Sequence, residues 1–115
     1  MSQGLSRNQL LLSKLLDDLR EYMPGAAFPT AQDAEAVTDF LVAQIHAQPR
    51  GQFEIHYHDG STICECQIFG HSAIVQIVGA GWWYSDVLAI AGAVLICAKK
   101  ARENQNEQNY TSNPN

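Results

Sequence analysis

The chain has 115 residues, of which 46% are hydrophobic and 17% are charged, and its formal net charge at pH 7 is -5. This length suits one domain with one core, and the apolar fraction excludes a chain that is disordered overall. No Lys or Arg lies between Gly51 and Ala98, so this stretch offers no cation to a phosphate. Such a charge distribution argues against a nucleic-acid-binding protein.

The first predicted helix begins after Ser6, a typical N-cap residue three positions before Gln9. Apolar residues then recur at helical spacing as far as Met23, and Pro24-Gly25 ends the helix. The opposite side of this amphipathic helix carries the acidic residues Asp17, Asp18 and Glu21.

A second helix is predicted with Thr30 as its N-cap, and Pro49-Arg50-Gly51 ends it. Acidic side chains in its first turns suit the positive end of the helix dipole. The apolar stripe consists of Val37, Leu41 and Ile45, and the acidic residues are Asp33, Glu35 and Asp39.

From Gln52 the apolar period changes from helical to two, which predicts three short strands joined by two tight turns. With Asp59-Gly60 as the first turn, the expected partners are Tyr57 and Thr62, Ile55 and Cys64, and Phe53 and Cys66. With Gly70-His71 as the second turn, the expected partners are Ile68 and Ala73, Cys66 and Val75, and Cys64 and Ile77.

These registers place the apolar strand residues on one face, which we expect helices to cover. This core face holds Phe53, Ile55, Tyr57, Cys64, Cys66, Ile68, Ala73, Val75 and Ile77. The other face mixes polar and apolar residues, and we interpret it as a contact surface; it holds Glu54, His56, His58, Ile63, Glu65, Gln67, Ile74, Gln76 and Val78.

A last helix is predicted with Ser85 as its N-cap, ending at about Arg102. Small side chains recur every four residues in it, from Ser85 to Ala101, and form a ridge that packs either on the sheet or on a second copy of the chain. We therefore predict one α+β domain over residues 1–102, followed by a flexible polar tail over 103–115. Its order is two helices, a three-stranded antiparallel meander and a C-terminal helix, with the helices on one face of the sheet.

The helix-strand-strand-strand-helix order from Ala31 onward, with Val78-Gly79-Ala80-Gly81 before an alanine-rich helix, is similar to the double-stranded-RNA-binding domain. That resemblance covers about 70 residues and implies the fold alone. Such domains carry a Lys-Lys cluster at the start of the last helix, where this chain has Ser85-Asp86-Val87-Leu88. Because those positions lack phosphate-binding cations, RNA binding is not expected.

No metal site, cofactor or catalytic centre is predicted. The weak metal candidates are His56, His58 and Glu65, which share a sheet face with Glu54. Cys64 and Cys66 project from the opposite face, so they cannot join the histidines around one zinc ion. The chain has no nucleophile elbow, Walker motif or metalloprotease motif, which favours a protein that is not an enzyme.

A membrane span is not predicted, because the unbroken apolar run from Val87 to Ala98 is too short to cross a bilayer. The odd set of cysteines, Cys64, Cys66 and Cys97, is typical of reduced thiols, and no secretory signal precedes Leu5. We therefore expect a cytoplasmic protein.

Two functions remain open from the sequence. The first is an adaptor or inhibitor whose acidic helices meet a basic partner protein through Asp17, Asp18, Glu21, Asp33, Glu35 and Asp39. The same carboxylates are also what the solvated sides of two amphipathic helices would carry. The second is a small-molecule-binding protein that uses Trp82, Trp83 and Tyr84. A homodimer is expected in either case, because the sheet has two edges and a half-apolar back.

Overall fold

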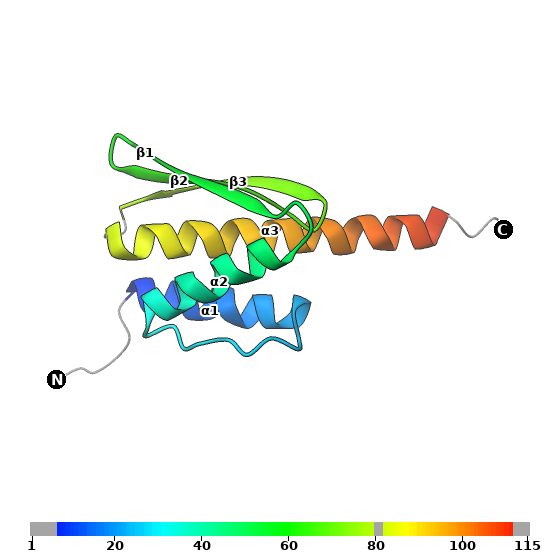
Figure 1. The fold of residues 1–115 in the computed structure, drawn as a ribbon, viewed down its shortest axis with the longest axis horizontal. Helices are drawn as coiled ribbons and strands as arrows, with labels where there is room; N and C mark the ends of the chain where they lie inside the picture. Colours follow the sequence, from blue (N-terminus) through cyan, green and yellow to red (C-terminus); the bar gives the residue numbers. More distant parts are fainter. Residues whose placement is uncertain (1–6, 80–81, 112–115) are drawn as a thin grey trace.

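The computed structural model describes residues 7–79 and 82–111, with side chains over 7–79 and 84–104. Three helices and three strands follow the predicted order (Figure 1). They are α1 (Arg7–Tyr22), α2 (Ala34–Ala47), β1 (Gln52–His58), β2 (Ser61–Ile68), β3 (His71–Val78) and α3 (Trp82–Thr111). The strands form one antiparallel sheet in the order β1-β2-β3.

The molecule is layered around α3, which runs between the sheet and the other two helices (Figure 1). One side of α3 packs on β2 and β3, and its other side packs on α1 and α2. Of the two N-terminal helices, α2 contacts the sheet at β1. The predicted fold with all helices on one side of the sheet is therefore confirmed, and α3 supplies most of the cover.

The core forms where these layers meet. The leucines on one side of α1 and the predicted stripe of α2 are fully buried, as their helical spacing requires; the buried leucines of α1 are Leu12, Leu16 and Leu19. The small-residue ridge of α3 is also buried: Ala89, Ala93 and Cys97 are 0% exposed. Cys97 Sγ lies 3.6 Å from the carbonyl oxygen of His71 in β3, so the ridge faces the sheet rather than a second copy of the chain.

The first hairpin has the predicted register, with Ile55 opposite Cys64. The predicted register of the second hairpin was wrong by two residues. The turn lies one residue earlier than predicted, at Phe69-Gly70 and not at Gly70-His71, and this moves every cross-strand partner by two. Cys66 therefore pairs with Ala73, and Cys64 pairs with Val75. Phe69 and Gly70 have φ values of 59° and 77°, the left-handed conformations of a two-residue hairpin turn. Since the error is an even number of residues, every side chain stays on its predicted face.

Three helix ends differ from the sequence prediction. Asp33 rather than Thr30 caps α2, and its carboxylate accepts a hydrogen bond of 3.0 Å from the Ala36 amide. α3 begins at Trp82, so Ser85 is a buried residue inside the helix and not its N-cap. α3 also continues past Arg102 to Thr111, so the predicted polar tail is helical over most of its length.

Arg102 fixes the middle of α3 to the end of α1. Its guanidinium donates a hydrogen bond of 3.0 Å to the carbonyl oxygen of Glu21 and lies 3.9 Å from the ring centroid of Tyr22. Beyond this contact α3 projects past the other elements (Figure 1). Within the described residues, no helix combines the length and the apolar content needed to span a membrane.

Candidate functional site

The outer face of the sheet, which points away from α3, is open to solvent over all three strands. Its side chains bond to one another across the strands: the Gln52 amide donates to Gln67 at 2.7 Å, and the Gln76 amide donates to the Ser61 hydroxyl at 3.0 Å. On β3, Ile74 and Val78 are 68% and 71% exposed. The mixed face predicted from the sequence is thus present as a polar network beside two exposed apolar side chains.

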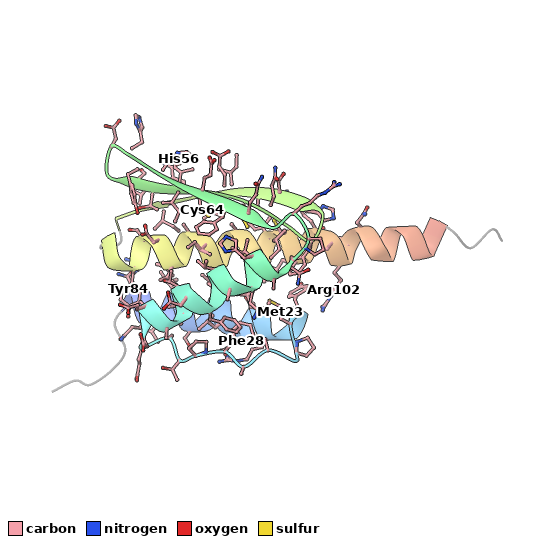
Figure 2. The ribbon with its side chains drawn as sticks, in the orientation of Figure 1. Met23, Phe28, His56, Cys64, Tyr84 and Arg102 are labelled. Atoms are coloured by element: carbon pink, nitrogen blue, oxygen red, sulfur yellow. The ribbon has the colours of Figure 1, made fainter. Side chains whose placement is uncertain are left out.

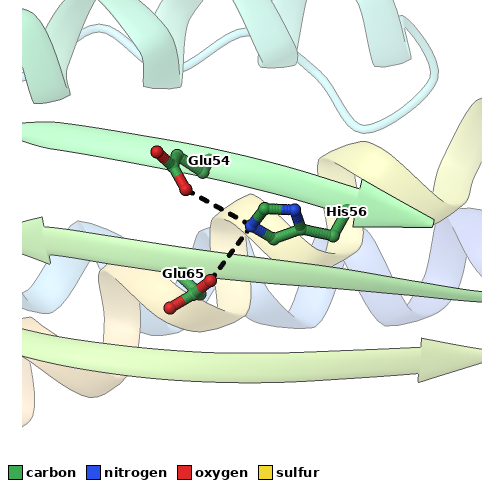
Figure 3. Close-up of side chains that lie close together, drawn as sticks. All are labelled: Glu54, His56 and Glu65. Carbon is green, nitrogen blue, oxygen red and sulfur yellow. Dashed lines mark ion pairs between the residues drawn. The ribbon is translucent and has the colours of Figure 1, made fainter. Parts of the chain in front are cut away.

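Three side chains of this face converge over β1 and β2, as Figure 3 shows. His56 Nε2 lies 3.3 Å from Glu54 Oε1 and 3.0 Å from Glu65 Oε2. The three donor atoms lie within 4.8 Å of one another, and all three side chains are at least half exposed. Glu54 and Glu65 are directly opposite each other in the β1–β2 register. We call these three residues the Glu-His-Glu cluster.

His58, the other histidine named from the sequence, does not join the cluster. It lies at the tip of the first hairpin, where its Nε2 is 3.2 Å from Asp59 Oδ2. Its side chain is 78% exposed. The structure therefore brings His56 and Glu65 together with Glu54 and leaves His58 apart.

All three thiols are buried, and Cys64 and Cys66 project from the face of the sheet that packs on α3, as predicted; Figure 2 labels Cys64. Burial raises the pKa of the Cys64 thiol to about 11. A hydrogen bond shared by Cys66 and Cys97 raises the pKa of Cys66 and lowers that of Cys97, while burial raises both. Because all three thiols are free and at most 1% exposed, they fit a structural role rather than that of nucleophiles.

Tyr57 and Asp86 form a bond between β1 and the first turns of α3 that the sequence did not indicate. The Tyr57 hydroxyl lies 2.8 and 2.9 Å from the two carboxylate oxygens of Asp86. Donation to this carboxylate raises the pKa of the phenol, and desolvation and the negative charge of Asp86 raise it further. Tyr57 was predicted to face the core; its hydroxyl reaches Asp86 of α3, while 65% of the residue is exposed.

A groove of about 510 Å³ lies where α1, the end of β3 and α3 meet. We call it the α1–β3 groove. Its apolar lining includes Leu11, Leu15, Ile77, Val78 and Leu88, and its charged lining is Arg7, Lys14 and Asp18. Leu11 is 47% exposed and Val78 is 71% exposed, so large apolar side chains border solvent here. The sequence did not predict this groove, because it forms only when the first helix packs beside the last strand.

The aromatic residues of the small-molecule hypothesis lie at the start of α3. The side chains of Trp82 and Trp83 are outside the described residues, and Tyr84 is half-buried against the core. Two residues that flank this segment in the sequence, Gly79 and Leu88, line the α1–β3 groove.

The acidic residues of the adaptor hypothesis come from both N-terminal helices, and several have local partners. Asp17 forms an ion pair with Arg20, Asp33 caps α2, and Asp18 lines the groove. Glu21, Glu35 and Asp39 are exposed. Among the described residues, Glu35 and Asp39 have no ion-pair partner, so α2 presents two uncompensated carboxylates to solvent.

Comparison of the chain with protein-family models, with curated proteins and with solved structures gives no match. The element order from α2 to α3 that resembles the double-stranded-RNA-binding domain is present. At the start of α3, however, Ser85 and Val87 are buried and Asp86 binds Tyr57. The place of the Lys-Lys cluster thus holds no cation.

Proposed function

We propose that this protein is a non-catalytic interaction module, an adaptor or inhibitor that binds a partner protein. The observation that carries the proposal is the α1–β3 groove, a concave surface with apolar walls and large exposed side chains at its rim. Exposed apolar surface of this kind is typical of places where another molecule docks. The occupant that fits is an apolar segment of the partner, because such a segment would remove Leu11 and Val78 from water.

The exposed carboxylates of α1 and α2 favour a basic partner surface. The net charge of the chain is -5, and these two helices carry the exposed carboxylates of Asp17, Glu21, Glu35 and Asp39, whereas the charged lining of the groove itself includes Arg7 and Lys14. Complementary charge increases the rate of encounter and orients the partner, while the apolar groove supplies affinity. Binding of this kind weakens as the salt concentration rises.

Co-purification from the native cells with matched variants tests the proposal. Leu11→Gln removes apolar surface from the groove, whereas Leu10→Gln changes the neighbouring residue of α1, which is 56% exposed and is not part of the groove lining. We expect one partner protein to co-purify with the wild type and with Leu10→Gln and to be lost with Leu11→Gln. Retention of the same partner by Leu11→Gln would count against the groove.

Reversal of the acidic charges on α2 tests the electrostatic part separately. Asp39→Lys and Glu35→Lys lie outside the groove lining, and neither residue caps a helix. The double variant should bind the partner more slowly, with a weaker dependence on salt, while the affinity contributed by the groove is retained. An unchanged rate of association would show that these carboxylates only form the solvated side of the helix.

We also propose that the protein forms a homodimer along β3 in the cytoplasm. β3 is an edge strand, and it carries the exposed side chain of Ile74. Pairing two such edges would satisfy backbone groups and bury Ile74. Sedimentation at several protein concentrations should report a dimer for the wild type and a monomer for Ile74→Gln, and a monomeric wild type would rule the dimer out.

The alternative function is binding of a small molecule in the same groove, and its size favours this alternative, since 510 Å³ lies within the range of ligand pockets. Trp82 and Trp83 lie in the sequence between groove-lining residues, so their fluorescence should change on binding. A saturable change with a fractionated metabolite extract would favour a ligand, and a flat signal would favour the partner protein.

A further inference from the structure

We propose that the Glu-His-Glu cluster binds a divalent transition-metal ion such as Zn²⁺, with one oxygen each from Glu54 and Glu65 and Nε2 of His56 as ligands. The proposal rests on this cluster alone and is independent of the α1–β3 groove. Three features carry it: the distances between the donor atoms, the charge balance of the sheet and the types of donor.

The donor atoms have the spacing of ligands around one ion. Zinc bonds to nitrogen and oxygen are about 2.0–2.2 Å long, which places neighbouring donors of a tetrahedron about 3.3–3.6 Å apart. His56 Nε2 lies 3.3 Å from Glu54 Oε1 and 3.0 Å from Glu65 Oε2, and all three atoms fall within 4.8 Å. Small rotations of exposed side chains would therefore complete three metal bonds.

The charge balance of the sheet also calls for a cation at this position. Glu54 and Glu65 are directly opposite each other on neighbouring strands, and like charges in that arrangement destabilise a sheet. No Lys or Arg occurs anywhere from Gly51 to Ala98, so the basic side chain beside the pair is His56, which neutralises carboxylates only when it is protonated and then carries a single charge against two. A divalent ion would neutralise both carboxylates at once.

The types of donor indicate the class of metal. Imidazole together with carboxylates suits Zn²⁺, Mn²⁺, Fe²⁺, Ni²⁺ or Cu²⁺, whereas Ca²⁺ and Mg²⁺ prefer oxygen ligands only. The buried thiols of Cys64 and Cys66 lie on the other side of the sheet and cannot contribute. Three protein ligands on an exposed surface leave the remaining coordination positions to water.

The first experiment titrates the full-length protein with ZnCl₂ and follows the histidine side chains by NMR. We expect saturation at one ion per chain, with the largest shift on the Nε2 resonance of His56 and smaller shifts on His46, His58 and His71. Because this measurement needs no variant, it does not depend on any substitution being tolerated. No saturable shift of His56 would overturn the proposal, as would zinc bound by the cysteines.

The second experiment compares His56→Ala with His58→Ala by calorimetry. The two histidines are two residues apart on one strand and share a sheet face, but only His56 contacts both glutamates. His56→Ala and Glu65→Gln should each weaken zinc binding by about tenfold or more, while His58→Ala should leave it within about twofold. An equal loss with His58→Ala would assign the zinc to scattered surface histidines and overturn the site.

The failure of this proposal can be distinguished from failure of the interaction module. The substitution Glu65→Gln changes no residue of the groove, and the substitution Leu11→Gln changes no residue of the Glu-His-Glu cluster. Each variant therefore tests one surface.

Discussion

The two faces of the sheet belong to the same three strands but have opposite environments. On the inner face Cys64, Cys66 and Ile68 are at most 2% exposed beneath α3, while on the outer face Ile74 is 68% exposed. Because neighbouring strand residues point to opposite sides, one sequence can place a core on one face and a polar network on the other. The comparison suggests that stability depends on the inner face and that the outer face is free to bind.

The largest expected effect tests this division with two isoleucines. Ile68→Ala should reduce the free energy of unfolding by about 2–5 kcal/mol, because it leaves a cavity beneath α3. Ile74→Ala removes the same atoms from a site that is exposed in the single chain, so at concentrations that keep the protein monomeric it should cost less than about 1 kcal/mol. Urea denaturation followed by circular dichroism measures both. Equal losses would mean that the outer face is covered, by a second copy or another partner.

The next effect concerns the close contact between α3 and the inner face. Ala93 is 0% exposed, so Ala93→Leu should overpack the layer and cost about 1–3 kcal/mol. Gly92→Ala is the matched control on the adjacent residue. Its new methyl group would lie 3.5 Å from Val75 Cγ1, an ordinary contact, and alanine favours helix by up to about 1 kcal/mol over glycine.

Thermal denaturation of both variants checks the prediction, because the expected signs are opposite. Ala93→Leu should lower the melting temperature, and Gly92→Ala should leave it unchanged or raise it. A stable Ala93→Leu variant would mean that α3 sits less closely on the sheet than the buried ridge implies.

The periodic parts of the sequence predicted the layers, because burial on one face leaves a direct trace in the spacing of apolar residues. The element order, the first hairpin and the buried ridge of α3 followed from this spacing. The position of the second turn did not follow from this spacing. Glycine is the usual residue in a left-handed conformation, but here Phe69 adopts that conformation together with Gly70. Two-residue periodicity cannot detect a register error of two residues, so it predicted the face of the sheet on which each side chain lies but not its partner on the next strand.

Helix ends and sites depend on contacts that spacing does not encode. Both Thr30 and Asp33 can cap a helix, and the chain uses Asp33, whose carboxylate reaches the Ala36 amide. The first hairpin register placed Glu54 beside Glu65, so the Glu-His-Glu cluster was within reach of the sequence. The groove and the Tyr57–Asp86 bond required the packing of α1 and α3 against the sheet.

The smallest effect concerns the hydrogen bond from Tyr57 in β1 to Asp86 in α3. Tyr57→Phe removes the donor and should cost no more than about 1 kcal/mol at neutral pH, because the tyrosine is largely exposed. Asp86→Asn keeps an acceptor and removes the charge, so it should cost less than Tyr57→Phe. Equilibrium denaturation of the three proteins at pH 7 checks this order.

The pH dependence of the difference in unfolding free energy between the wild type and Tyr57→Phe identifies the cause of that difference. The folded-state pKa of Tyr57 is raised above its ordinary value of 10.0, so the folded protein holds this proton more tightly than the unfolded chain. The stabilisation is therefore fully present below about pH 10 and is lost as the pH rises through the folded-state pKa. The difference between wild type and Tyr57→Phe should be constant from neutral pH to about pH 9 and shrink above about pH 10. A difference that persists there would come from packing of the ring and not from the proton shared with Asp86.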